Sequence, residues 1–352
     1  MRQQFRPLAV ASIESLCDDA AAVTFDVPPE WAGAYAFAAG QSLALRRDID
    51  GRDERRSYSI CAPAGAPLRI GVREVPDGLF SRWLVRDVRP GDRVEVAPPT
   101  GSFTPDPARP AHHVLIGAGS GITPLLSIAA SVLVHPAARV TLLYGNRRAG
   151  TVMFADELAD LKDRYPTRLE LVHLLSREPR DAELFSGRLD AGRLRRLLPL
   201  LLPVSAVDHW WLCGPFGMVT DARSVLAEHA VPPARVHQEL FYVGDVPPEP
   251  ARHEEAVDAG PHSTVTVVLD GRSTTVAVPA GSTILDAVSR TRPDLPFACK
   301  GGICGTCRAR LVDGEVRMRR NFALEEAELD AGFVLTCQAV PVGESVTVDY
   351  DT

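Results

Sequence analysis

The stretch FACKGGICGTCRARL, Phe297–Leu311, holds three of the seven cysteines of this 352-residue chain within nine residues. A fourth cysteine follows 30 positions after the third, so the spacing is C-x4-C-x2-C and then one distant cysteine. Two irons and two sulfides need four converging thiolates, and a tight loop can supply three while the fourth comes from another element. The spacing therefore predicts a plant-type 2Fe-2S cluster held by Cys299, Cys304, Cys307 and Cys337.

Glycines within the same stretch support this prediction. Gly301, Gly302 and Gly305 let a short loop wrap, because glycine tolerates positive φ, and they leave backbone N–H groups free to approach sulfur. Zinc sites usually present two matched Cys or His pairs, and no second pair is present here. Disulfides are disfavoured, because an odd cysteine count without a secretion signal fits a reducing cytoplasm.

Composition narrows the class of protein. The hydrophobic content of 45% and the charged content of 24% are ordinary globular values. The net charge of −7 argues against a nucleic-acid partner. The most apolar run, LRRLLPLLLPVSAV over Leu194–Val207, is broken by arginines and prolines and falls short of the ~20 residues of a spanning helix. We expect no nucleic acid, no membrane and a cytoplasmic location.

Three composition regimes predict three domains. Residues 1–108 hold closely spaced short β-like runs, which indicate a barrel or a sandwich. Strand-like and helical runs alternate over 109–243, which predicts an α/β domain with a parallel sheet. Residues 244–262 are rich in Pro, Glu and Ala and are expected to form a linker. Residues 263–352 open with a hairpin around Asp270-Gly271, and Ser282 is the predicted N-cap of a following short helix.

A glycine-rich turn lies inside the predicted α/β domain. VLIGAGSGITPLLSI places Gly117, Gly119 and Gly121 between a strand and a helix, where backbone N–H groups can meet a pyrophosphate. Its G-x-G-x-G spacing departs from G-x-G-x-x-G, and the next strand, ending LLYGNR, offers no acidic residue for a ribose. A plain NAD dehydrogenase is therefore excluded, and a glycine-rich turn without a ligand remains an alternative.

This turn resembles the nicotinamide domain of the ferredoxin–NADP reductase superfamily, which carries G-x-G-x-G-[IT]-x-P and a later C-G-P. The chain has GAGSGITP over Gly117–Pro124 and CGP over Cys213–Pro215. The resemblance implies that Cys213 lies beside the nicotinamide C4, whereas an ordinary buried cysteine is the alternative. It also implies a dinucleotide site formed by Gly117, Gly119, Gly121, Thr123, Gly214 and Pro215.

The same superfamily has a flavin signature, R-x-Y-[ST] followed by G-x-x-S. Here RSYS, Arg56–Ser59, is followed by GLFS, Gly78–Ser81. The resemblance implies bound FAD, with Arg56 on the pyrophosphate, Tyr58 against the isoalloxazine ring and the Ser59 hydroxyl at N5. An arginine fork suits phosphate. Gly78 and Ser81 would open a helix that holds phosphate; a surface arginine beside an ordinary strand Tyr-Ser is the alternative.

The coenzyme preference depends on a third pair of residues. Ser176 and Arg177 follow the third predicted strand of the α/β domain. In plant-type reductases a Ser-Arg pair at this place meets the 2′-phosphate. Together with the missing acidic residue, this resemblance favours NADPH, and NADH remains open.

The order of flavin barrel, nicotinamide domain and plant-type ferredoxin covers essentially the whole chain and resembles bacterial oxygenase reductases, above all the reductase subunits of phenylacetyl-CoA epoxidases (ring 1,2-epoxidases). The resemblance implies a multidomain protein with an antiparallel β-barrel flavin domain, an α/β parallel-sheet nicotinamide domain and an α+β, β-grasp-like ferredoxin domain. It implies an NAD(P)H-dependent oxidoreductase that passes electrons singly through FAD and the 2Fe-2S cluster, with Tyr58, Ser59 and Cys213 as its catalytic residues.

The electron acceptor is expected to be a separate protein. A di-iron site needs paired E-x-x-H motifs on helices, and the one such motif, Glu170–His173, falls in a predicted strand. Oxygen chemistry would therefore belong to a partner oxygenase, for which the resemblance favours a multisubunit di-iron epoxidase. A reductase of a steroid or aromatic-ring oxygenase and a redox-sensing module are the alternatives.

Overall fold

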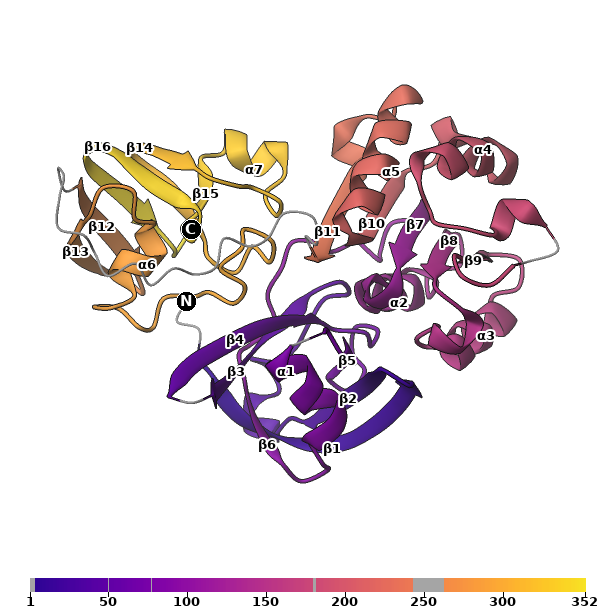
Figure 1. Cartoon of the computed structure of the whole chain (residues 1–352), viewed down its shortest axis with the longest axis horizontal. Helices are drawn as coiled ribbons and strands as arrows, with labels where there is room; N and C mark the ends of the chain where they lie inside the picture. Colours follow the sequence, from indigo (N-terminus) through magenta and orange to yellow (C-terminus); the bar gives the residue numbers. More distant parts are fainter. Residues whose placement is uncertain (1–3, 50, 77, 180–181, 243–262) are drawn as a thin grey trace.

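The computed structural model describes residues 4–49, 51–76, 78–179, 182–242 and 263–352. Three β-sheets follow one another along the chain (Figure 1). The predicted linker, 244–262, lies outside the described residues. The predicted domain boundaries at 108 and 243 remain predictions.

The first sheet is antiparallel throughout, with the order β4-β3-β6-β1-β2-β5. Its two edge strands meet through a bridge between Ile60 and Ile70, and the Cys61 N–H donates to the Arg69 carbonyl at 2.9 Å. The sheet therefore curls into the expected barrel around a core that includes Leu43. The elements are β1 (Arg6–Cys17), β2 (Ala20–Asp26), β3 (Ser42–Ile49), β4 (Arg52–Ser59), β5 (Arg69–Arg73), α1 (Leu79–Arg82) and β6 (Arg93–Val96).

The second sheet is wholly parallel, with the order β11-β10-β7-β8-β9, as predicted for an α/β domain. One core cluster packs α2 and α3 on one face, and another packs α4 and α5 on the opposite face. The strand order reverses between β7 and β10, and ligands bind at the carboxyl ends of strands at such a switch point. The elements are β7 (His112–Ala118), α2 (Ile122–Val132), β8 (Arg139–Asn146), α3 (Ala155–Arg164), β9 (Leu169–Leu175), α4 (Ala191–Leu201), β10 (His209–Pro215), α5 (Phe216–Glu228) and β11 (Val236–Tyr242).

The third sheet is mixed, with the order β13-β12-β16-β14-β15, in which β12 and β16 run parallel and the other neighbours antiparallel. The predicted hairpin is confirmed, because Asp270 and Gly271 turn at φ values of 53° and 67° between β12 and β13. The elements are β12 (Ser263–Leu269), β13 (Arg272–Val278), α6 (Ile284–Val288), β14 (Arg308–Met318), α7 (Glu326–Asp330), β15 (Phe333–Leu335) and β16 (Ala339–Asp349).

The predicted N-cap of α6 is wrong by one residue. Ser282 lies in the preceding turn, where its N–H donates to the Pro279 carbonyl at 3.0 Å. Thr283 is the N-cap, and its hydroxyl oxygen accepts from the Asp286 N–H at 3.3 Å. Both residue types can cap a helix, so the geometry of the turn decided between them.

All three units contact one another, with the second and third sheets side by side on the barrel (Figure 1). Arg69 of β5 pairs with Glu157 of α3 at 2.8 Å, which joins the barrel to the α/β unit. Phe216 of α5 meets Phe322 of the third unit edge-on, with ring centroids 5.5 Å apart. Among the described residues, no helix combines the length and the apolar character needed to span a membrane.

Candidate functional site

A cavity of about 730 Å³ lies where the three units meet. Its volume is within the roughly 300–1,000 Å³ of typical cofactor sites. The barrel, the α/β unit and the third unit all contribute to its wall. The lining residues include Arg56, Tyr58, Ser59, Arg73, Gly78, Ser81, Ser120, Glu239, Cys299, Ile303 and Cys304. The structure thus brings the predicted flavin residues together with two of the four predicted cluster cysteines.

Strand β4 supplies the first flavin motif. The Tyr58 ring lies 6.1 Å from the Phe80 ring, and burial raises the pKa of the Tyr58 hydroxyl, which stays protonated. The Arg56 side chain is 50% exposed; its Nη1 contacts Glu54 Oε2 at 2.8 Å and donates to the Arg55 carbonyl at 2.7 Å. An exposed guanidinium beside an aromatic ring on one cavity wall suits a ligand that has both a phosphate and a flat ring.

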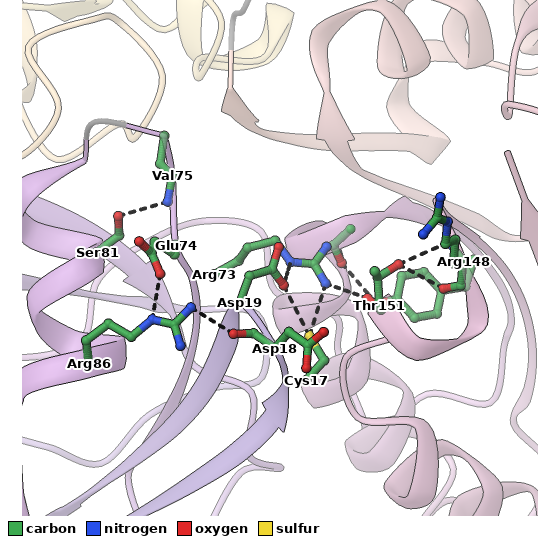
Figure 2. Close-up of polar contacts among 12 residues, drawn as sticks. Cys17, Asp18, Asp19, Arg73, Glu74, Val75, Ser81, Arg86, Arg148 and Thr151 are labelled. Carbon is green, nitrogen blue, oxygen red and sulfur yellow. Dashed lines mark hydrogen bonds and ion pairs between the residues drawn. The ribbon is translucent and has the colours of Figure 1, made fainter. Parts of the chain in front are cut away.

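The second flavin motif forms a tight turn at the start of α1. The Ser81 hydroxyl donates to the Gly78 carbonyl at 3.1 Å. It also accepts from the Val75 N–H at 3.0 Å, as Figure 2 shows. A Cβ on Gly78 would lie 2.6 Å from the Ser81 hydroxyl, so only glycine fits. A short helix begins at Leu79, directly after Gly78, and the Ser81 hydroxyl is used within the turn. The role of Gly78 and Ser81 in holding phosphate stays a prediction.

Arg73, at the end of β5, is a second arginine of the cavity that sequence reasoning missed. Its Nε pairs with Asp19 at 3.2 Å and its Nη2 donates to the Thr151 carbonyl of the α/β unit (Figure 2). A Cβ on Gly119 would lie 3.2 Å from its Nη1, so the guanidinium touches the glycine-rich turn. The alternating run LRIGVREV predicts a strand but carries no signal for this position.

The predicted dinucleotide turn lies at the switch point of the parallel sheet. Gly117 pairs in register with Cys213, and a Cβ on Gly121 would lie only 2.2 Å from the Cys213 carbonyl oxygen. The Thr123 hydroxyl donates to the Ser120 carbonyl at 3.0 Å and so fixes the turn from inside. Glycine is required here because the turn contacts the neighbouring strand directly.

The end of β10 completes this arrangement. Gly214 has a φ of 148°, and a Cβ there would lie 3.1 Å from the Ala118 N. Pro215 is the N-cap of α5 and is exposed. Cys213 is fully buried, and burial raises the pKa of its thiol well above the usual value, so the thiol stays protonated.

Glu239 of β11 is the other residue that sequence reasoning missed. It pairs in register with Cys213, and its carboxyl oxygens accept from the Ser59 hydroxyl, each at 3.3 Å. Burial raises the pKa of Glu239 to about 8, so its carboxyl group holds a proton at neutral pH. The available signal was an acidic residue near the end of the last strand, VHQELFY, next to the switch point.

The four predicted cluster cysteines form two pairs. A hydrogen bond joins Cys299 to Cys304 and another joins Cys307 to Cys337, and Cys307 also interacts electrostatically with Cys299 and Cys304. The hydrogen bond from Cys304 lowers the pKa of the Cys299 thiol to about 6, and the Gly301 N–H also donates to its sulfur at 3.3 Å. Two thiolates for each of two irons is the donor set of a 2Fe-2S cluster.

Within the described part of the chain, no group of three or more His, Cys, Asp or Glu side chains is placed to share one ion. A structural zinc needs four ligands around one centre. The choice of a 2Fe-2S cluster over zinc rests on the C-x4-C-x2-C spacing and the distant fourth cysteine.

Ser176 and Arg177 lie apart from the cavity. They follow β9, and β8 separates that strand from the switch point. The Arg177 side chain is exposed, and its backbone N–H donates to the Arg147 carbonyl at 2.8 Å. Arg147 and Arg177 thus lie in neighbouring loops that follow β8 and β9. The role of Ser176 and Arg177 in binding a 2′-phosphate stays a prediction.

Comparison with known proteins agrees with this site. Three family profiles match in order: an oxidoreductase FAD-binding domain over residues 7–104, an oxidoreductase NAD-binding domain over 115–224, and a 2Fe-2S iron-sulfur cluster binding domain over 267–342. One component of the 1,2-phenylacetyl-CoA epoxidase of Escherichia coli (strain K12) is 40% identical over 99% of this chain and 98% of its own length.

Two further relatives extend the comparison. The ferredoxin reductase component of the 3-ketosteroid-9-alpha-monooxygenase of Rhodococcus rhodochrous is 33% identical over 97% of this chain and 96% of its own. The solved structure of phthalate dioxygenase reductase, 24% identical, covers 98% of both chains with a TM-score of 0.61 and has the same fold.

Fold, site and relatives together define an oxidoreductase of the ferredoxin reductase type, with FAD-binding, NAD-binding and 2Fe-2S domains. The chain belongs to the family of NAD(P)H-dependent flavin and iron–sulfur reductases that serve multicomponent oxygenases. Its substrates in this family are NAD(P)H and an oxygenase partner that accepts the electrons.

Proposed function

We propose that this chain is the reductase of a phenylacetyl-CoA epoxidase and carries electrons from NADPH to a multisubunit di-iron oxygenase in the cytoplasm. The observation that carries the proposal is one cavity whose wall holds the flavin motifs and also Cys299 and Cys304. The choice of epoxidase is supported by the 40% identity to the Escherichia coli epoxidase component, against 33% to the steroid monooxygenase component.

The barrel residues bind and shield the flavin. Bound FAD would supply both two-electron and one-electron redox chemistry, while the protein supplies position and electrostatics. Arg56 and Arg73 both line the cavity and would neutralise phosphate charge. Tyr58, on the same wall, would cover one face of the ring and exclude water. Gly78 and Ser81, at the start of α1, line the same cavity.

Ser59 and Glu239 form a hydrogen-bonded pair that can hold a proton beside the flavin. The Ser59 hydroxyl donates to the Glu239 carboxyl group, which is itself protonated at neutral pH. A group with a pKa near the working pH can both hold and release a proton. When FAD is bound, this pair would hold or move a proton at the hydroxyl oxygen of Ser59, on the cavity wall that both residues line.

The α/β unit binds the nicotinamide coenzyme. The turn over Gly117–Gly121 presents backbone N–H groups and the start of α2 to the pyrophosphate. Cys213, Gly214 and Pro215 close the other side of the switch point. Ser176 and Arg177 bind the 2′-phosphate and give the preference for NADPH.

Two experiments test the proposal. The first is stopped-flow reduction with NADPH and NADH, followed at flavin and cluster wavelengths; the variant Arg177→Ala should raise KM for NADPH and leave KM for NADH unchanged. The second is reconstitution with purified epoxidase oxygenase subunits and phenylacetyl-CoA, with a 3-ketosteroid oxygenase as the comparison acceptor. Faster electron delivery to the steroid oxygenase would contradict the assignment.

A further inference from the structure

Arg55 lies at the contact between the flavin barrel and the third unit, the ferredoxin domain, and it takes no part in the cofactor binding described above. Its side chain is only 4% exposed. Successive residues of a strand point to opposite faces, so Arg56 reaches the cavity while Arg55 points the other way. A buried guanidinium needs partners that offset the loss of its hydration, and those partners indicate its role.

The partners of Arg55 come from two domains. On its own strand, Nη2 pairs with Asp53 Oδ2 at 2.8 Å and Nε donates to Oδ1 at 3.1 Å. Across the domain contact, Nη2 donates to the Pro293 carbonyl at 3.3 Å and Nη1 donates to the Leu295 carbonyl at 3.4 Å. The Arg55 guanidinium is therefore anchored in the barrel by Asp53 and donates to two backbone carbonyls of the ferredoxin domain.

The segment that Arg55 holds leads directly into the cysteine loop. The guanidinium carbon lies 4.0 Å from the ring centroid of Phe297, two positions before Cys299. The next residue, Ala298, is 3% exposed and packs on Ala44 and Ala97 of the barrel, with Cys304 against the same cluster. Alanines on both sides allow close approach of the two backbones, so the contact brings the loop onto the barrel wall.

We propose that Arg55 is a positioning residue, which docks the ferredoxin domain on the flavin barrel and thereby holds the Cys299–Cys304 pair against the cavity. The inference rests on the proposed function. NAD(P)H supplies two electrons and each reduction of the cluster consumes one, so two successive transfers cross this contact for every hydride, and the external acceptor takes both electrons.

The test uses the full chain loaded with FAD and iron–sulfur cluster. In Arg55→Ala, flavin reduction by NADPH keeps its wild-type rate, whereas the following reduction of the cluster slows several-fold, because the rate of electron transfer falls as donor and acceptor move apart. Arg55→Lys gives an intermediate rate, because an ammonium can pair with Asp53 but cannot stack on Phe297 and reach both carbonyls.

A second readout does not depend on turnover. Small-angle X-ray scattering of Arg55→Ala should give a larger radius of gyration than the wild type. The matched control is Arg47→Ala, which removes a guanidinium stacked 4.4 Å over Trp83 within the barrel and should change neither measurement.

Wild-type values for Arg55→Ala in either the cluster-reduction rate or the scattering overturn the inference. The proposed function fails in a different way. If the wild-type chain itself shows no reduction of flavin and cluster by NADPH, the proposed function is wrong; if it shows both and Arg55→Ala matches it, only the role of Arg55 is wrong.

Discussion

Replacing Gly121 with alanine should separate hydride delivery from every later step. The added methyl would lie 2.2 Å from the Cys213 carbonyl oxygen and 2.8 Å from the Gly214 nitrogen. Because Cβ contacts under 3.0 Å are essentially never found, the turn must move away from β10 by about 0.8 Å. Both groups are backbone atoms of a central strand, so no side chain can rotate away to make room.

Two magnitudes follow from this displacement. Forcing a group into a packed interior costs typically about 1–3 kcal/mol of stability. Misplacing a bound reactant by about 1 Å can slow a reaction roughly 100-fold. We therefore expect Gly121→Ala to lose about 1–3 kcal/mol of unfolding free energy and to reduce flavin with NADPH roughly 10- to 100-fold more slowly, with flavin and iron content unchanged.

The assay pairs stopped-flow flavin reduction with urea denaturation followed by tryptophan fluorescence, since Trp210 and Trp211 lie in the core of the α/β unit. Gly192→Ala is the matched control. A Cβ there meets nothing closer than Asp190 Oδ1 at 3.5 Å, and alanine in α4 should add up to about 1 kcal/mol. If Gly121→Ala retains both the wild-type stability and the wild-type rate, the reasoning about the switch point is refuted.

Three further predictions concern other parts of the site. The pKa of Glu239 is about 8 in the folded protein and 4.5 in the usual case, so at a pH between these values unfolding releases a proton. The free energy of unfolding should therefore fall as pH rises from about 4.5 to about 8. Urea titrations across that range should show a flatter slope for Glu239→Gln. Cys304→Ser removes one iron ligand and should abolish the visible cluster absorption while flavin content and ferricyanide reduction persist; an intact cluster spectrum would argue against the ligand assignment. Phe216→Ala and Phe322→Ala should show a coupling of about 0.5–1.5 kcal/mol in a double-mutant cycle of thermal unfolding, and strict additivity would mean that their edge-on contact contributes nothing.

The sequence predicted most accurately where function needs residues close together along the chain. The cysteine spacing predicted a 2Fe-2S cluster, which the matching 2Fe-2S domain confirms, while its four ligands stay a prediction. Glycines at Gly117 and Gly121 predicted a turn between strand and helix, which is present between β7 and α2. The predicted N-cap at Ser282 was wrong, because two adjacent residues could both cap the helix and the geometry of the preceding turn placed Thr283 at the N-cap.

The sequence by itself determined the order of the three domains and the local motifs, because strand alternation, helix periodicity, glycine turns and cysteine spacing are all short-range patterns. The tertiary structure alone decided which distant residues complete the site. Ser59 meets Glu239 across 180 positions and Arg55 meets Leu295 across 240, and no periodicity within a strand reports such a contact. Those contacts exist because three units pack around one cavity. The surfaces that the units present to one another, and not the sequence pattern within any one unit, determine which residues come into contact.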